Sequence, residues 1–291
     1  MESFSSIVVC IEYGRLGKDQ WIQNLFSVYD NLKKVILYLL PAGTFCELWP
    51  ILFTVFFGLP QPLASIEMII ISMLTDCVAS MSLIKEKPEA DLLLRMPRRP
   101  EKDKLANFKL LFQAYCFIGI PMLVCASAMA FRVFSQAGIP FSSLWLSFGN
   151  VQVNGVPVDP VLYQDTLYRA QSVYFVTLVL MQWGNLLMTR TRRLSILQQP
   201  PIGPKSTRNL YIFMAMGFTL SILVLFIFIP FFQNVFHTRD VYVEYWFIRT
   251  TTFWLKLTIA LGFGVGLLLM DETRKAIVRR WPKGIIARFA W

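Results

Sequence analysis

Residues 35–84 read VILYLLPAGTFCELWPILFTVFFGLPQPLASIEMIIISMLTDCVASMSLI. Two apolar runs, at about 35–57 and 64–84, are separated only by the GLPQP link of residues 58–62. A helix of roughly 20 apolar residues is long enough to cross the hydrocarbon core of a bilayer. Because proline and glycine favour tight turns, the link predicts an antiparallel hairpin of two membrane-spanning helices.

Four further apolar stretches follow this hairpin, at about 108–131, 170–189, 209–231 and 250–270. Of all residues 55% are apolar and only 16% are charged, whereas soluble domains carry roughly 25% charged residues. The sequence therefore predicts an all-α integral membrane protein, a bundle of six transmembrane helices. The longest connection, roughly 132–169, is typical of an irregular loop and not of a separate domain.

The formal net charge of +10 comes from basic residues placed in short blocks between the apolar runs. Segments 1–34, 85–109, 190–208 and 271–291 hold four, eight, five and six of them, which is 23 of the 28 Lys and Arg residues. Loops rich in Lys and Arg stay on the cytoplasmic side. We therefore expect a multi-pass protein with both termini in the cytoplasm, placed in the plasma membrane and not in internal membranes. No nucleic acid is expected as a partner, because no polar basic domain is present.

Glu47 lies midway along the first predicted span, between Pro41 and Pro50. Each proline removes a backbone donor and leaves carbonyl oxygens of the preceding turn without their helical partner. A carboxylate beside such carbonyls is a candidate oxygen cage for a hard cation. Since the hairpin packs the first two spans together, Glu47 and Asp76 are positioned to approach one ion.

Further polar side chains lie within the predicted spans. Ser72 and Asp76 share one face of the second helix, with Thr75 beside them. Gln182 and Asn185 stand three residues apart in the fourth span and offer neutral oxygens. Ionisable residues within a membrane usually face a cavity, a partner or a substrate path. The alternative is a mutually satisfied network of interhelical hydrogen bonds.

No catalytic residues are expected. The sequence contains no Asp-Lys-Thr-Gly phosphorylation motif and no GxxxxGK[ST] phosphate loop. His237 is the only histidine, and the five cysteines show no CxxC spacing. We therefore expect no ATP hydrolysis by this chain alone, no cofactor and no metal apart from the transported cation.

Several motifs along the chain carry a family resemblance: EYGRL (12–16), YDNLKK (29–34), Thr75-Asp76, RMPRRP (95–100), QWGN (182–185) and Asp271-Glu272 with Arg279-Arg280. Together they resemble the carboxy-terminal transmembrane region of a type II P-type cation-transporting ATPase. The sodium/potassium-transporting ATPase alpha subunit is the most similar member. The resemblance implies helices five to ten of such a pump, with cations bound midway across the bilayer.

Carried over residue by residue, the resemblance assigns four positions to cation ligands: Glu47, Thr75, Asp76 and Gln182. Ser72 and Asn185 stand where the family usually has aspartates. Because the number of carboxylates tunes cation affinity and selectivity, the cargo is a monovalent or other hard cation that need not follow sodium/potassium exchange.

The resemblance also divides the chain. Residues 1–34 correspond to a cytoplasmic hinge segment and residues 35–291 to the transmembrane domain. Residues 17–27 are absent from the family pattern, so we interpret them as a retained intron or gene-model error, or alternatively as an amphipathic surface turn. The expected partners are the lipid bilayer and the missing catalytic half. A beta subunit is not expected, because the loop at 132–169 lacks the family's aromatic and glutamine signature.

Two other hypotheses stay open at this point. In the first, the chain is a stand-alone polytopic membrane protein that binds a partner or lipid, or passes ions passively without ATP. In the second, it is a pseudogene fragment without function.

Overall fold

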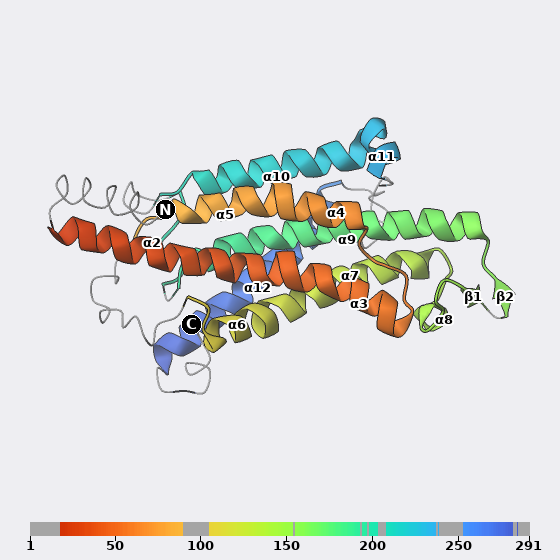
Figure 1. Ribbon diagram of the computed structural model, residues 1–291, viewed down its shortest axis with the longest axis horizontal. Coiled ribbons are helices and arrows are strands. Elements are labelled where there is room, and N and C mark those ends of the chain that lie inside the picture. The colour runs from red at the N-terminus through yellow and green to blue at the C-terminus, as the bar shows by residue number, and fades with distance from the viewer. Residues whose placement is uncertain are drawn as a thin grey trace, which may run out of the picture.

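The computed structural model describes residues 18–89, 105–153, 155–192, 194–196, 198–202, 208–236, 238, 253–281 and 284. Over these residues the chain forms a bundle of long helices that run along one common axis (Figure 1). The start of α2 and the end of α12 lie at one end of the bundle, and α8 with the β1–β2 hairpin lies at the other.

The elements follow one another as α2 (Lys18–Leu39), η1 (Leu40–Phe45), α3 (Cys46–Phe57), α4 (Ser65–Ile70), η2 (Ile71–Asp76), α5 (Cys77–Ile84), α6 (Phe108–Phe112), η4 (Gln113–Gly119), α7 (Ile120–Gln136), α8 (Phe141–Leu144), β1 (Gln152–Val153), β2 (Val156–Pro157), α9 (Pro160–Thr189), α10 (Tyr211–Phe228), α11 (Pro230–Phe236) and α12 (Phe253–Arg280). The segments named η are π-helical turns that join the α-helices on either side into continuous rods.

Four helices among the described residues are long and apolar enough to cross a membrane: Ser27–Phe57, Ser65–Ile84, Phe108–Gln136 and Pro160–Thr189. They overlap the first four predicted spans. The apolar part of α10, Tyr211–Ile227, is shorter. The fold is therefore helical with several membrane-spanning candidates, and the count of six spans stays a prediction.

The predicted span at 209–231 is interrupted near its end. Ile229 adopts an extended conformation, with φ −87° and ψ 118°, and Pro230 begins α11. A proline disfavours helical geometry in the residue before it and has no amide proton of its own. The break therefore follows from Pro230, which a hydropathy average does not detect.

Helix α9 begins ten residues before the predicted span at 170–189. The side chain of Asp159 accepts a hydrogen bond from the amide of Val161 and caps the helix, and Pro160 occupies its first position. The added turns carry an ion pair between Asp165 and Arg169, at 2.9 Å, one helical turn apart. This extension is polar, so an apolar window misses it.

The connection between α7 and α9 is shorter than predicted and partly regular. It holds α8 and a two-stranded antiparallel hairpin in which Val153 pairs with Val156. The connection also closes the end of α3, because the amide of Leu146 donates to the carbonyl of Phe57 at 2.9 Å and that of Phe148 to Gly58 at 3.1 Å. Gly58 ends α3 with a φ of 59°, which glycine adopts without strain.

Helix α9 is the centre of the bundle and packs most extensively against α7 and α12. Nearly all of its membrane-spanning part is buried. It approaches α12 closely at two glycines, since a Cβ atom added to Gly184 would lie 2.8 Å from the Cα atom of Gly264. Small residues let two helix backbones approach in this way.

The backbone of α2 is helical from Lys18, so the described part of the 17–27 segment continues into the first spanning helix. The interpretation of residues 17–27 as a retained intron or gene-model error, or alternatively as a surface turn, stays a prediction. Residues 1–17, at the amino-terminal side of it, lie outside the described residues.

Candidate functional site

Three π-helical segments interrupt the first three spanning helices at neighbouring places. Segment η1 contacts both η2 and η4. A π-helical turn inserts an extra residue into the helix, and such turns are frequent at functional sites. The predicted ligands Ser72, Thr75 and Asp76 lie within η2, and Glu47 lies two residues after η1. The site is thus built where the regular hydrogen-bond ladder is locally altered.

Glu47 and Ser72 form the first half of the site. The Ser72 hydroxyl lies 2.9 Å from Oε1 and 3.2 Å from Oε2 of Glu47. It also lies 2.8 Å from the carbonyl oxygen of Met68. A hydroxyl has one proton and two acceptor lone pairs. Ser72 therefore serves as a donor to Glu47 or as a neutral oxygen ligand beside it, depending on how its hydroxyl is rotated.

Asp76 is the centre of the second half and is only 2% exposed. Its Oδ1 accepts a hydrogen bond from the Tyr38 hydroxyl at 3.3 Å, whereas its Oδ2 is buried without a hydrogen-bond partner. Gly43 in η1 leaves room for this oxygen, because a Cβ atom there would lie 3.0 Å from Oδ2. A buried oxygen without a partner is costly, and a bound cation would satisfy it.

Helix α9 contributes two amides. Asn185 is fully buried and donates from Nδ2 to the carbonyl of Tyr38 at 3.0 Å, and its Oδ1 has no hydrogen-bond partner. Gln182 is 2% exposed, and its Nε2 is buried without a partner. Since an amide can present either its oxygen or its nitrogen, a half-turn of Gln182 about its last bond would offer a further oxygen ligand.

Thr75 behaves differently from the other predicted ligands. It is fully buried, and its hydroxyl donates to the carbonyl of Ile71 one turn earlier at 2.7 Å. This bond is the ordinary one for a threonine within a helix. Its lone pairs stay available, but among the described residues its hydroxyl makes no hydrogen bond to another predicted ligand.

The structure therefore pairs Glu47 with Ser72, and it joins Asp76 to Asn185 through Tyr38. Within the described part of the chain, no hydrogen bond links Glu47 to Asp76. The Tyr38 hydroxyl donates to Asp76 of η2, and the Tyr38 carbonyl accepts from Asn185 of α9. Tyr38 was not among the predicted site residues. The sequence feature that points to Tyr38 is its hydroxyl group, which lies more than two turns before Glu47 in an otherwise apolar run.

Glu67, at the start of α4, is a buried carboxylate outside the candidate cation site. In the structure Glu67 is 1% exposed and its Oε2 accepts the amide of Ala64 at 3.1 Å. It therefore caps the helix.

The described residues contain no group of three or more His, Cys, Asp or Glu side chains that could hold a metal ion. The site instead offers two carboxylates with neutral hydroxyl and amide oxygens, donors that suit hard cations and not transition metals.

A second buried polar cluster lies at the end of the bundle where α2 begins. Glu86 accepts from Arg190 at 2.7 Å and from the side-chain amide of Asn209 at 2.6 Å. Lys34 of α2 pairs with Glu89 at 2.9 Å. This cluster ties α2, α9 and the segment after α5 together. It was not predicted, because the basic residues of these segments were interpreted only through the membrane orientation that they favour.

A third buried charge lies on α12, beyond the predicted membrane span. Lys275 bonds Asp271 at 2.7 Å, the carbonyl of Met188 at 3.0 Å and the hydroxyl of Thr191 at 2.9 Å. Burial lowers the pKa of Lys275, and the charge of Asp271 partly opposes this effect. These bonds fasten the end of α12 to the end of α9.

An apolar helical bundle with unpartnered buried oxygens on η2 and α9 fits a membrane protein of the cation-transport class. Residues 60–277 match the family described as Cation transporting ATPase, C-terminus. The match covers most of the chain, and the chain belongs to this family of P-type ATPases.

Curated relatives agree with this assignment. The chain is similar to the sodium/potassium-transporting ATPase subunit alpha-4 of Homo sapiens and to the alpha subunit of Hydra vulgaris, each 29% identical over 99% of this chain and 26% of the relative. It is also similar to the potassium-transporting ATPase alpha chain 2 of Cavia porcellus, with 31% identity over 97% of this chain and 25% of the relative. The chain thus spans about a quarter of the length of these relatives.

Proposed function

We propose that this chain is the cation-translocation region of a P-type pump. It binds a monovalent or other hard cation between three parts of the bundle: the helix formed by η1 and α3, segment η2, and helix α9. The protein ligands are Glu47 and Asp76, assisted by Ser72, Thr75, Gln182 and Asn185. The observation that carries the proposal is a group of three buried polar atoms of η2 and α9 without hydrogen-bond partners: Asp76 Oδ2, Asn185 Oδ1 and Gln182 Nε2. Family membership supports the same reading.

The finer topology belongs to this proposal. Six spans cross the plasma membrane, with α10–α11 and α12 in the last two, and both termini lie in the cytoplasm. The basic clusters at one set of loop segments support that orientation. ATP hydrolysis and its Mg²⁺ belong to catalytic domains outside residues 1–291, and no beta subunit is required.

Equilibrium binding of radioactive rubidium and sodium to the purified 1–291 chain tests this proposal. Asp76→Asn keeps the shape of the side chain but removes the charge, and a hydrogen bond or contact to a charged group contributes about 1.5–3 kcal/mol. We therefore expect saturable binding that weakens by about tenfold or more in this variant.

Asp165→Asn is the matched control, since Asp165 carries the same charge at the far, solvent-accessible start of α9. Its binding should equal that of the unsubstituted chain. Equal loss in both variants, or no saturable binding at all, would refute the site. Saturable flux through vesicles without ATP would instead favour a stand-alone channel-like protein.

A further inference from the structure

Pro50 leaves one particular carbonyl without its helical donor. It lies inside α3, four residues after Cys46. In a regular helix the amide of residue 50 would donate to the carbonyl of residue 46. Proline has no amide proton, so the Cys46 carbonyl, directly before Glu47 in the chain, must find another partner.

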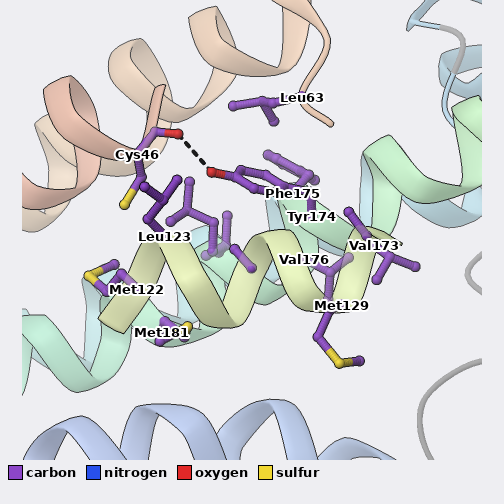
Figure 2. Close-up of a cluster of buried hydrophobic side chains, with 14 of the residues drawn as sticks. Cys46, Leu63, Met122, Leu123, Met129, Val173, Tyr174, Phe175, Val176 and Met181 are labelled. Carbon is purple, nitrogen blue, oxygen red and sulfur yellow. Dashed lines mark hydrogen bonds between the residues drawn. The ribbon is translucent and has the colours of Figure 1, made fainter. Parts of the chain in front are cut away.

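That partner is Tyr174 of α9. Its hydroxyl donates to the Cys46 carbonyl at 2.8 Å, and both residues are 0% exposed. Figure 2 shows Tyr174 reaching α3 through a cluster of apolar side chains, among them Leu63 and Leu123, with the hydrogen bond as the dashed line. Tyr174 belongs to the main cluster of buried apolar side chains, and the Cys46 carbonyl is the hydrogen-bond partner of its hydroxyl.

The same hydrogen bond engages the Cys46 carbonyl oxygen, an atom of the type that binds hard cations. Carbonyl oxygens released from a helix, beside a carboxylate, are ligands for hard cations. The Tyr174 hydroxyl instead occupies the Cys46 oxygen, one residue before the carboxylate of Glu47. A carbonyl oxygen has two lone pairs, and the hydroxyl proton takes one of them, so the oxygen is a weaker ligand for a cation.

We propose that Tyr174 sets the affinity of the cation site. Its hydroxyl engages the Cys46 carbonyl and so weakens this oxygen as a ligand for the ion. This inference rests on the proposed cation site. It also assigns a role to α9 beyond Gln182 and Asn185, because Tyr174 lies on the same helix two turns earlier.

Rubidium binding to the purified 1–291 chain tests the inference through the sign of the change. Tyr174→Phe removes only the hydroxyl and frees the carbonyl, so rubidium should bind about three- to tenfold more tightly, the range that one hydrogen bond supports. The thermal midpoint of the variant should fall slightly, because a buried acceptor loses its donor. A purely structural role predicts the same fall without any gain in affinity.

Pro50→Ala supplies the control background, since the amide of residue 50 can then donate to the Cys46 carbonyl. In this background Tyr174→Phe should leave rubidium affinity unchanged. Unchanged or weaker binding in the single variant Tyr174→Phe, or an equal gain in the Pro50→Ala background, overturns the inference while the cation site stands. No saturable binding to the unsubstituted chain would refute the site itself and the inference with it.

Discussion

Replacing Arg190 with methionine should destabilise the bundle more than any change to an exposed basic residue. Arg190 is fully buried and donates to Glu86 Oε1 at 2.7 Å and to the carbonyl of Gln199 at 2.7 Å. In the variant, Glu86 stays 4% exposed and keeps the hydrogen bond from Asn209 but loses its cation. Breaking a buried ion pair on one side costs about 3–5 kcal/mol. We expect a loss of free energy of unfolding in that range.

The assay is a titration of the purified chain from a mild detergent into dodecyl sulfate, followed by circular dichroism and tryptophan fluorescence. Arg279→Met is the control, because Arg279 lies at an exposed position and bonds Gln198 at 3.2 Å. Surface changes of this kind cost within about 0.5 kcal/mol. A second change, Glu86→Gln, removes the uncompensated charge and should restore more than half of the stability lost by Arg190→Met.

Two results would refute this reasoning. One is a cost for Arg190→Met of less than about 1 kcal/mol, which would mean that Glu86 reaches water or another cation. The other is the failure of Glu86→Gln to restore stability, which would assign the loss to the missing volume or to the bond with Gln199 and not to the buried charge.

Two further predictions concern glycines. Gly184→Ala should cost about 1–3 kcal/mol in the same titration, because the added Cβ atom would overlap the backbone of Gly264. Gly266→Ala is the control and should be neutral or slightly stabilising, because no atom lies near its Cβ position. Equal stability of the two variants would contradict the close helix contact. Gly43→Ala should weaken rubidium binding about threefold with little loss of stability, because its Cβ atom would press on Asp76 Oδ2, and unchanged affinity would place the cation away from that oxygen.

The long helices of the bundle were predictable from the sequence, because each follows from a local run of apolar residues. The hairpin of residues 35–84 follows from two apolar runs and one turn, and helices now cover both runs. The polar start of α9 and the break at Pro230 were missed for a different reason. A hydropathy window measures only apolarity, whereas a helix also continues through a capped polar turn and stops at a proline.

The candidate ligands were selected from single residues, and their relations were not predictable. Extra residues in η1 and η2 rotate the side chains that follow them. Helical spacing alone therefore does not show that Glu47 is hydrogen-bonded to Ser72 or that Asp76 is hydrogen-bonded to Tyr38. The Cys46 carbonyl shows the same limit. Pro50 revealed that it loses its helical donor, but only the packing of α9 against α3 shows that Tyr174 replaces that donor.

Locating the bound ion tests the central claim most directly. Thallium resembles potassium in charge and size and scatters anomalously, so crystals of the purified chain grown in thallium salt would mark its position. We predict one strong anomalous peak among the helices, in direct contact with Asp76 Oδ2 and with an amide oxygen of α9. A peak only at the bundle surface, or none within contact of Asp76, would contradict the account.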